Sequence, residues 1–212
     1  MISKRHISNP LALAVLALLD ERPMHPYEMG VLLRERGKQE SIKLNYGSLY
    51  TVIEALQRNQ LITPQETLRE GRRPERTVYA LTEAGRAELF DWLRALLREP
   101  AKEYTQFAAG LSFVALLPPS EVVALLEDRA VYVAQEIESM RDRMDAALHE
   151  GLARLFLIEI EHEVVLREAE LRWVREIRDA IANGTLSGMQ EWLAFHAEHT
   201  AGKEDDETTN EQ

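Results

Sequence analysis

The sequence predicts a mainly α-helical protein in two parts, and three observations carry this prediction. The first half has short helical segments and one pair of β-rich stretches, at residues 61–70 and 76–82. The second half consists of long segments with apolar residues at helical spacings. The charge divides in the same way: residues 1–99 hold 15 Lys and Arg against 13 Asp and Glu, whereas residues 100–212 hold 10 against 23.

Two short helices are expected first. Asn9 and Pro10 are typical of a helix start, because asparagine caps the first turn and proline tolerates the first helical position. The apolar run 11–19 has the outline of a secretory signal, but it is too short to span a bilayer and no small-residue cleavage site follows. The second helix should run from Pro26 to a stop at Gly37. No longer apolar run follows, so we expect a cytoplasmic protein without a membrane partner.

The third predicted helix, about residues 46–59, has two unlike faces. Its buried face is expected to hold Leu49, Val52, Ile53 and Leu56. Its other face is small, aromatic and hydroxyl-bearing, and carries Tyr46, Gly47, Ser48, Tyr50, Thr51, Gln57 and Arg58. Such side chains donate hydrogen bonds to phosphates and base edges, so this face suits a nucleic acid. A helix that is merely polar on its outer side is the alternative.

The two β-rich segments predict a hairpin with a basic tip. Gly71 and Pro74 supply its turn, and residues 69–76 hold four arginines and two glutamates. Arginine is favoured beside the phosphate backbone and in narrow minor grooves. A loop kept soluble by its charge is the alternative. Thr82 can then cap a fourth helix that ends before Pro100.

Three helices followed by a hairpin are the arrangement of a winged helix-turn-helix domain with a two-stranded β wing. In this fold the third helix enters the major groove of DNA. We therefore expect a DNA-binding domain over residues 1–99. The net charge of −11 is no objection, because nearly all of the acidity lies in the second half.

The second half is expected to form an antiparallel helical domain over residues 100–200, with dimerisation as one of two ways to bury its apolar residues. One long helix starts at Ser120 and is interrupted near Gly151, a second follows, and a short third helix ends the domain. The apolar seams of the long helices must pack against each other or against a second copy. The residues assigned to dimerisation are Leu126, Val133, Ile137, Met140, Met144, Phe156, Ile160 and Val164. The acidic tail 201–212 has no periodicity and is expected to be disordered.

Catalysis and metal binding find little support in the sequence. Cysteine is absent, and we find no zinc-ligand spacing, nucleophile motif or phosphate-binding glycine loop. We therefore expect no enzyme, no cofactor and no metal. Aromatic residues near the junction of the two halves are candidates for a small-molecule effector site, with ordinary core or interface packing as the alternative: Trp92, Tyr104, Phe107 and Phe113.

The combination of motifs resembles the PadR family of transcriptional regulators. LALAVLALLDERPMHPYEM looks like the family's first two helices. LNYGSLYTVIEALQRNQLI, a basic wing and VYALTEAGRAELFDWL look like the elements that follow them. The likeness holds in motif detail over residues 9–99, and is looser beyond Pro100, towards the longer PadR-like proteins.

This resemblance implies a homodimeric repressor that binds an inverted repeat in double-stranded DNA and is released by a small-molecule inducer. The residues that would then contact DNA are His25, Tyr27, Lys43, Asn45, Tyr46, Gly47, Ser48, Tyr50, Thr51, Arg58, Arg72, Arg73 and Arg76. One departure is Pro26, which stands where the family commonly has glycine and removes a backbone donor. A helical protein-interaction module, using a winged-helix scaffold without specific DNA binding, is the competing interpretation.

Overall fold

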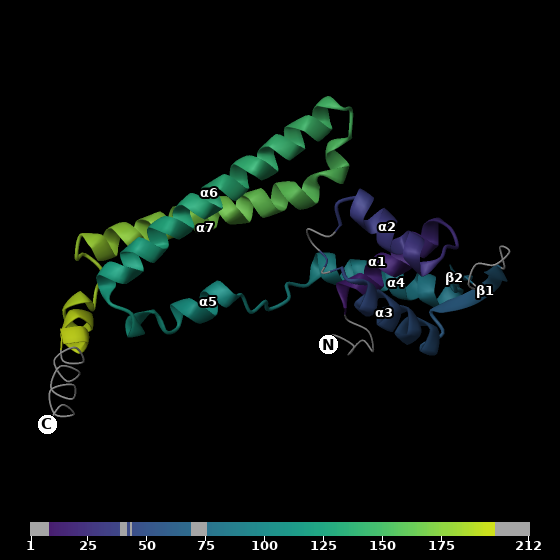
Figure 1. Ribbon diagram of the computed structural model, residues 1–212, viewed down its shortest axis with the longest axis horizontal. Helices are drawn as coiled ribbons and strands as arrows, with labels where there is room; N and C mark the ends of the chain where they lie inside the picture. Colours follow the sequence, from purple (N-terminus) through teal and green to yellow (C-terminus); the bar gives the residue numbers. More distant parts are fainter. Residues whose placement is uncertain (1–8, 39–41, 43, 69–75, 198–212) are drawn as a thin grey trace, which may run out of the picture. The chain divides into compact units, whose positions relative to one another are not determined.

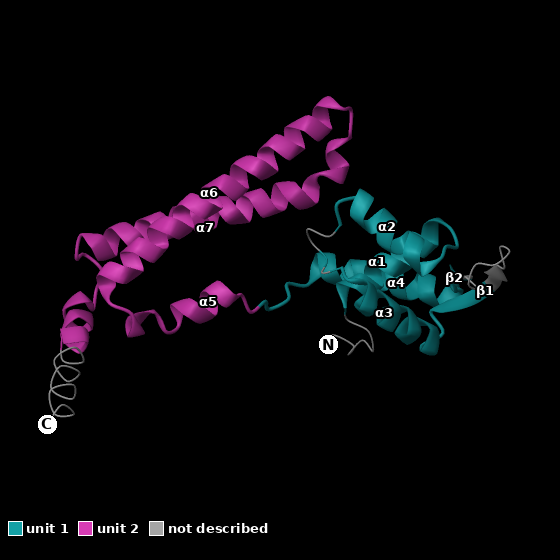
Figure 2. Cartoon of the chain, viewed as in Figure 1, with its two compact units in different colours: residues 1–103 teal, residues 104–212 magenta. Residues whose placement is uncertain are grey.

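The structure, a computed structural model, describes residues 9–38, 42, 44–68 and 76–197. The chain divides into two compact units, Met1–Glu103 and Tyr104–Gln212 (Figure 2). Each unit has its own hydrophobic core. The predicted mainly helical fold with a two-stranded antiparallel wing is confirmed.

The first unit combines helices with the wing (Figure 1). Two of its helices begin where a side chain was expected to cap them: Asn9 Oδ1 accepts from Leu11 N at 3.0 Å, and Thr82 caps the fourth helix. Asn45 caps the third helix. The elements are α1 (Pro10–Glu21), α2 (Pro26–Glu35), α3 (Tyr46–Arg58), β1 (Ile62–Leu68), β2 (Arg76–Leu81) and α4 (Glu83–Arg98).

Helix α1 is the centre of the first core. It packs against α3, α4 and β2, which explains why seven of its residues are buried and why its sequence is apolar on nearly every side. The buried face of α3 packs against it through the predicted residues Leu49, Val52, Ile53 and Leu56. Burial of this face fixes which side of α3 faces away from the core.

The wing is a two-stranded sheet with one irregularity. Strands β1 and β2 pair from Ile62 opposite Leu81 to Leu68 opposite Arg76, and the register shifts between Pro64 and Glu66. On the other edge of β2, Tyr79 exchanges two backbone hydrogen bonds of 3.1 Å with Met24. These bonds tie the wing to the segment between α1 and α2.

The wing joins α4 at a crowded corner. The Thr82 hydroxyl accepts from Gly85 N at 3.0 Å and donates towards the carbonyls of Gln60 and Leu61, at 2.8 and 3.0 Å. Gly85 leaves no room here, because a Cβ on it would lie 2.0 Å from the Leu61 carbonyl oxygen. The corner therefore requires glycine for close backbone approach, not for an unusual dihedral angle.

The second unit is a long helical hairpin with shorter helices around it (Figure 1). A turn at Gly151, with a φ of 88°, separates its two long helices. A further helical segment covers residues 189–197. The named elements are α5 (Gln106–Leu111), η1 (Val114–Leu116), α6 (Pro119–His149), η2 (Arg154–Phe156) and α7 (Ile158–Ala182).

The segment that leads into α6 is held by side chains from elsewhere in the second unit. The indole Nε1 of Trp192 donates to the Leu117 carbonyl at 3.0 Å, and His196 Nε2 lies 3.0 Å from the Ala115 carbonyl oxygen. Helix α5 was not predicted from the sequence, although Thr105 caps it. Over the described parts of the chain, no helix combines the length and apolar character needed to cross a membrane.

Candidate nucleic-acid interface

The outer face of α3 is the candidate interface. Its exposed residues recur at steps of three and four, because the buried positions occupy the opposite side of the helix. They are Gly47, Tyr50, Thr51, Glu54, Gln57 and Arg58, with Ser48 half-buried. Apart from Tyr46 and Ser48, which are half-buried, the polar face predicted from the sequence is exposed.

The first turn of α3 presents backbone N–H groups with little side-chain cover. Asn45 Oδ1 accepts from Ser48 N at 2.7 Å, so the Asn45 side chain is engaged as the cap. Gly47 is exposed and has only Asn45 Oδ1 near the place of a Cβ, at 3.6 Å. The Thr51 hydroxyl donates to the Gly47 carbonyl at 3.0 Å, so it can still accept a hydrogen bond.

Tyr46 joins α3 to α2. Its ring stacks on that of Tyr27 with centroids 6.0 Å apart and planes 5° from parallel. Arg34 lies over the same ring, 4.6 Å from the centroid, and donates Nη1 to the Tyr46 hydroxyl at 2.7 Å. A Cβ on Gly30 would lie 2.9 Å from the Tyr46 ring, so only glycine fits beneath it without a shift. Tyr46, predicted as a DNA contact, therefore also fixes how α3 sits on α2.

The start of α2 lies at the outer end of this stack. His25 Nδ1 accepts from Tyr27 N at 3.0 Å and caps the helix. Pro26 is buried at the first helical position, where it supplies no N–H. The Tyr27 side chain is 59% exposed beside Tyr46, which leaves its hydroxyl accessible. This end of α2 can thus offer the Tyr27 side chain to a phosphate.

Several predicted contacts fall outside the described residues. They are Lys43 at the approach to α3 and Arg72 and Arg73 at the wing tip. Arg76 lies at the start of β2, opposite Leu68, and only its backbone is described. These four stay predictions from the sequence.

Two residues of this region are absent from the sequence prediction, namely Arg34 and Glu54. Arg34 approaches Tyr46 from twelve residues earlier in the chain, and no local pattern in the sequence announces that contact. The sequence could have placed Glu54 on this face, because it follows Thr51 by three residues and precedes Arg58 by four on the same side of the helix.

Exposed ion pairs connect α1 with α2. Arg36 Nη2 donates to Glu21 Oε2 at 2.8 Å, and this hydrogen bond holds the pKa of Glu21 below its usual value. Arg22 donates to Glu28 and lowers the pKa of that carboxyl in the same way. Both arginines are neutralised locally, so they add little positive charge to the α3 face.

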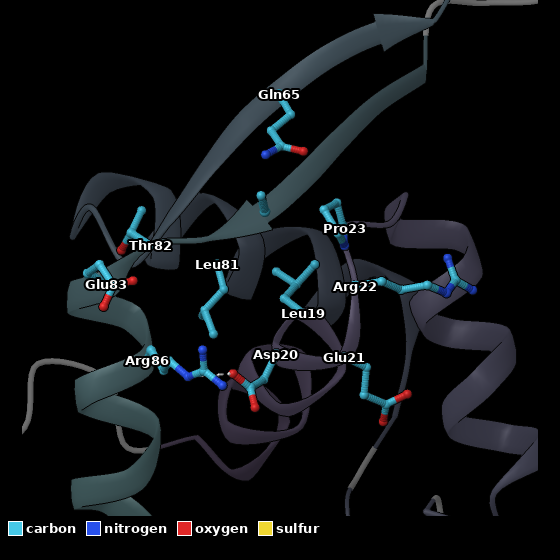
Figure 3. A pocket seen from close by; sticks show the side chains of 11 residues that line it. Leu19, Asp20, Glu21, Arg22, Pro23, Gln65, Leu81, Thr82, Glu83 and Arg86 are labelled. Atoms are coloured by element: carbon cyan, nitrogen blue, oxygen red, sulfur yellow. Dashed lines mark ion pairs between the residues drawn. The ribbon is translucent and has the colours of Figure 1, made fainter.

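A hollow of about 260 Å³ lies beside the wing strands (Figure 3). It is bordered by the end of α1, the start of α4 and Gln65 of β1. Asp20 and Arg86 face each other across part of it at 3.1 Å. It contains none of the predicted DNA-contacting or effector residues, and we assign it no ligand.

The predicted dimerisation residues pack largely within one chain. Leu126 is buried between α6 and α7 at one end of the hairpin, and Val133, Ile137, Met140 and Val164 are buried at the other, with Met144 and Ile160 partly buried against them. Phe156 differs, because it is 65% exposed. Of the two ways to bury the seam, packing between the two helices of one chain accounts for most of these side chains.

The predicted effector residues are divided between the units. Trp92 is 4% exposed in the core of the first unit. The Arg129 guanidinium lies over the ring of Phe107 in α5, with its Cζ 3.5 Å from the ring centroid. The Phe107 and Trp173 rings meet edge-on, with their centroids 6.2 Å apart. Tyr104 and Phe113 are strongly exposed, at 84% and 68%. Within the second unit, Phe107 docks α5 on the helical hairpin.

Comparison with known proteins finds a family match within the first unit. Residues 15–91 match the family described as "Transcriptional regulator PadR-like family". A comparison with curated proteins found no match.

Solved structures share the fold of most of the chain. Bacillus subtilis PadR in complex with operator DNA superposes with a TM-score of 0.64 at 20% identity, over 82% of this chain and 99% of that one. The same protein in complex with p-coumaric acid gives 0.63 at 18% identity, over 81% and 98%. The Vibrio cholerae virulence activator AphA gives 0.60 at 17% identity, over 83% and 99%.

The matched segment spans the region from α1 to α4, which includes the stack at Tyr46, the outer face of α3 and the wing. Over residues 15–91 the chain is therefore similar to the PadR-like family of transcriptional regulators.

Proposed function

We propose that this protein is a homodimeric DNA-binding repressor that recognises an inverted-repeat operator and is released by a small molecule. The observation that carries the proposal is the outer face of α3, which is exposed, rich in hydrogen-bonding groups and fixed to α2 through Tyr46. In winged helix-turn-helix proteins this helix enters the major groove. The family match spans the whole of it.

The proposed contacts divide into two kinds. The first turn of α3, with Gly47 and Ser48, approaches a phosphate through backbone N–H groups and the positive end of the helix dipole. Tyr50 and Thr51 then meet base edges, and the wing arginines meet the neighbouring backbone. Phosphate contacts set the position of the protein, and base contacts set its sequence preference.

Dimerisation is proposed to use a second apolar stripe on α7. Ile158, Val165 and Leu166 are 56%, 57% and 51% exposed, although α7 already buries Val174 and Ile181 against the rest of the hairpin. A helix with apolar residues on two sides needs a second partner, and a second copy supplies one by symmetry. Two reading helices are then available for two half-sites, spaced by about 34 Å or a multiple of it.

Release by a small molecule is proposed because of the family and the complex of Bacillus subtilis PadR with p-coumaric acid. Among the candidate residues, Tyr104, Phe107 and Phe113 lie in the second unit and stay proposed effector contacts. A ligand there changes DNA binding only if it binds one arrangement of the dimer's two α3 helices more tightly than another. Activation of transcription is the competing outcome, since AphA is described as an activator.

The test is a salt titration of binding to a duplex from the protein's own promoter, with a shuffled duplex of equal composition as the control. We expect the promoter duplex to bind more tightly than the control. Its affinity should fall about 100-fold between 50 and 200 mM salt, which corresponds to about four phosphate contacts. A flat salt response, or equal affinity for both duplexes, would favour the protein-interaction module instead.

A further inference from the structure

Glu54 is an unusual residue for a helix face directed at DNA. It is the single acidic residue in the α3 sequence, and its side chain is exposed. It lies on the same side as Gly47, Thr51 and Arg58, from which it is separated by seven, three and four residues. A carboxylate therefore sits in the middle of the proposed interface.

The described part of the chain gives this carboxylate no partner. Glu54 four residues before Arg58 is the favourable order for an ion pair along a helix. Even so, neither side chain makes a hydrogen bond or ion pair with any described residue, whereas Glu21 and Glu28 are each held by an arginine. The oxygens of Glu54 are thus available to a ligand of the α3 face.

Duplex DNA offers few groups that a carboxylate can accept from. Phosphate oxygens repel it, and guanine and thymine present only acceptors along the major groove, apart from the thymine methyl. Cytosine N4 and adenine N6 each present an amino group that donates. A carboxylate at this place is tolerated only where such an amino group faces it.

We infer that Glu54 is a specificity-determining residue that accepts a hydrogen bond from an exocyclic amino group of cytosine or adenine in the major groove. This inference rests on the proposed function. It assigns Glu54 two effects, a weakened affinity for random DNA through repulsion and a required amino-bearing base at one position of each half-site.

The experiment is selection of bound sequences from a random duplex pool, followed by affinity measurement on the selected site and its single-base variants. The proteins compared are the wild type, Glu54→Gln, Glu54→Ala and the control Glu83→Gln. Glu83 is also exposed, so its substitution removes the same charge from the same unit at the start of α4. Circular dichroism melting checks that all four proteins fold.

The wild type and Glu83→Gln should select cytosine or adenine at one shared position per half-site, by roughly tenfold over the other bases. Glu54→Ala should lose this preference and bind random duplex more tightly, while Glu54→Gln should prefer adenine, to which glutamine can both donate and accept. The base selected by the wild type distinguishes the cytosine and adenine forms of the contact.

Unchanged base frequencies in Glu54→Ala, together with normal DNA binding, would overturn the inference and leave the proposed function standing. If the wild type selects no sequence at all, the proposed function fails and this inference fails with it.

Discussion

At the scale of single residues, Gly85 is the position with the least tolerance for change. Its missing side chain lets the first turn of α4 approach the backbone of Leu61, which cannot move without breaking the Thr82 corner. We expect Gly85→Ala to lower the free energy of unfolding by about 3 kcal/mol, because the added methyl meets a backbone carbonyl instead of a flexible side chain. Urea unfolding of the full chain measures this change.

Gly47 is the matched control for that substitution. It is exposed on α3, and the nearest atom to its would-be Cβ is 3.6 Å away. Gly47→Ala should stabilise the helix by up to about 1 kcal/mol, since alanine loses less backbone entropy there than glycine. Equal destabilisation by both substitutions would show that loss of glycine itself, and not crowding at Gly85, is responsible.

The sequence predicted single residues well where their partners are close in the chain. Asn9 and Thr82 each cap a helix within three residues, which local chemistry determines. Tyr46 is different, since Gly30 and Arg34 reach it across the space between two helices. A pattern within α3 indicates that Tyr46 lies at the margin of the buried face. It does not indicate that residues of α2 contact the Tyr46 ring.

At the scale of elements, the wing can be tested through its tip. The last paired residues are Leu68 and Arg76, so the segment 69–75 connects the two strands and includes Arg72 and Arg73. We expect Arg72→Ala with Arg73→Ala to weaken binding to promoter and shuffled duplexes alike, because contacts to phosphates carry no sequence information. Because the dimer loses four wing arginines, the salt slope measured on the promoter duplex should become shallower by about one for each of them that contacts a phosphate.

The control for the wing pair is Arg94→Ala with Arg98→Ala, which removes two exposed charges from α4. It should leave the salt slope nearly unchanged. If the wing variant instead keeps its full affinity for both duplexes, the wing is not a DNA contact. Loss of affinity for the promoter duplex alone would mean that the wing reads sequence.

Elements with a hydrophobic periodicity or clear turn residues were predictable, whereas α5 was not. Helices α3 and α4 and the two strands follow from periodicity and turn residues, and their bounds agree with the expected ones to within a few residues. Helix α5 has six residues and no buried residue, so periodicity carries no signal for it. It is held by contacts of Phe107 with Arg129 and Trp173, from α6 and α7.

At the scale of the whole molecule, the assembly is expected to depend on α7. Val165→Asp with Leu166→Asp places two charges on the exposed stripe, away from the contacts with α6. We expect sedimentation equilibrium to change from a dimer to a monomer, since burying unpaired carboxylates at an interface is strongly unfavourable. Affinity for the inverted repeat should fall with it, because two joined half-sites no longer bind together.

Leu97→Asp serves as the control for the stripe, since Leu97 is 88% exposed at the end of α4. It should remain dimeric. If the stripe variant also remains a dimer of unchanged stability, another surface of the second unit joins the two copies.

The sequence left the use of the apolar seams open for a physical reason. Apolar residues at seven-residue spacing can pack equally well against a neighbouring helix of the same chain and against a helix of a partner chain. In the structure Val133, Ile137 and Met140 lie on the side of α6 that meets α7. Ile158 and Val165, which the dimerisation prediction omitted, lie exposed on α7.

The stack at Tyr46 has a consequence for exchanging reading helices between regulators of this kind. Grafting only the outward-facing positions of α3 from another protein keeps Tyr46 on Gly30 and under Arg34. The new side chains then keep the original orientation of α3 on α2. A graft that places a different residue at position 46 removes these contacts. The transplanted helix then packs on α2 at another angle, and its side chains point in directions that they did not have in the donor protein.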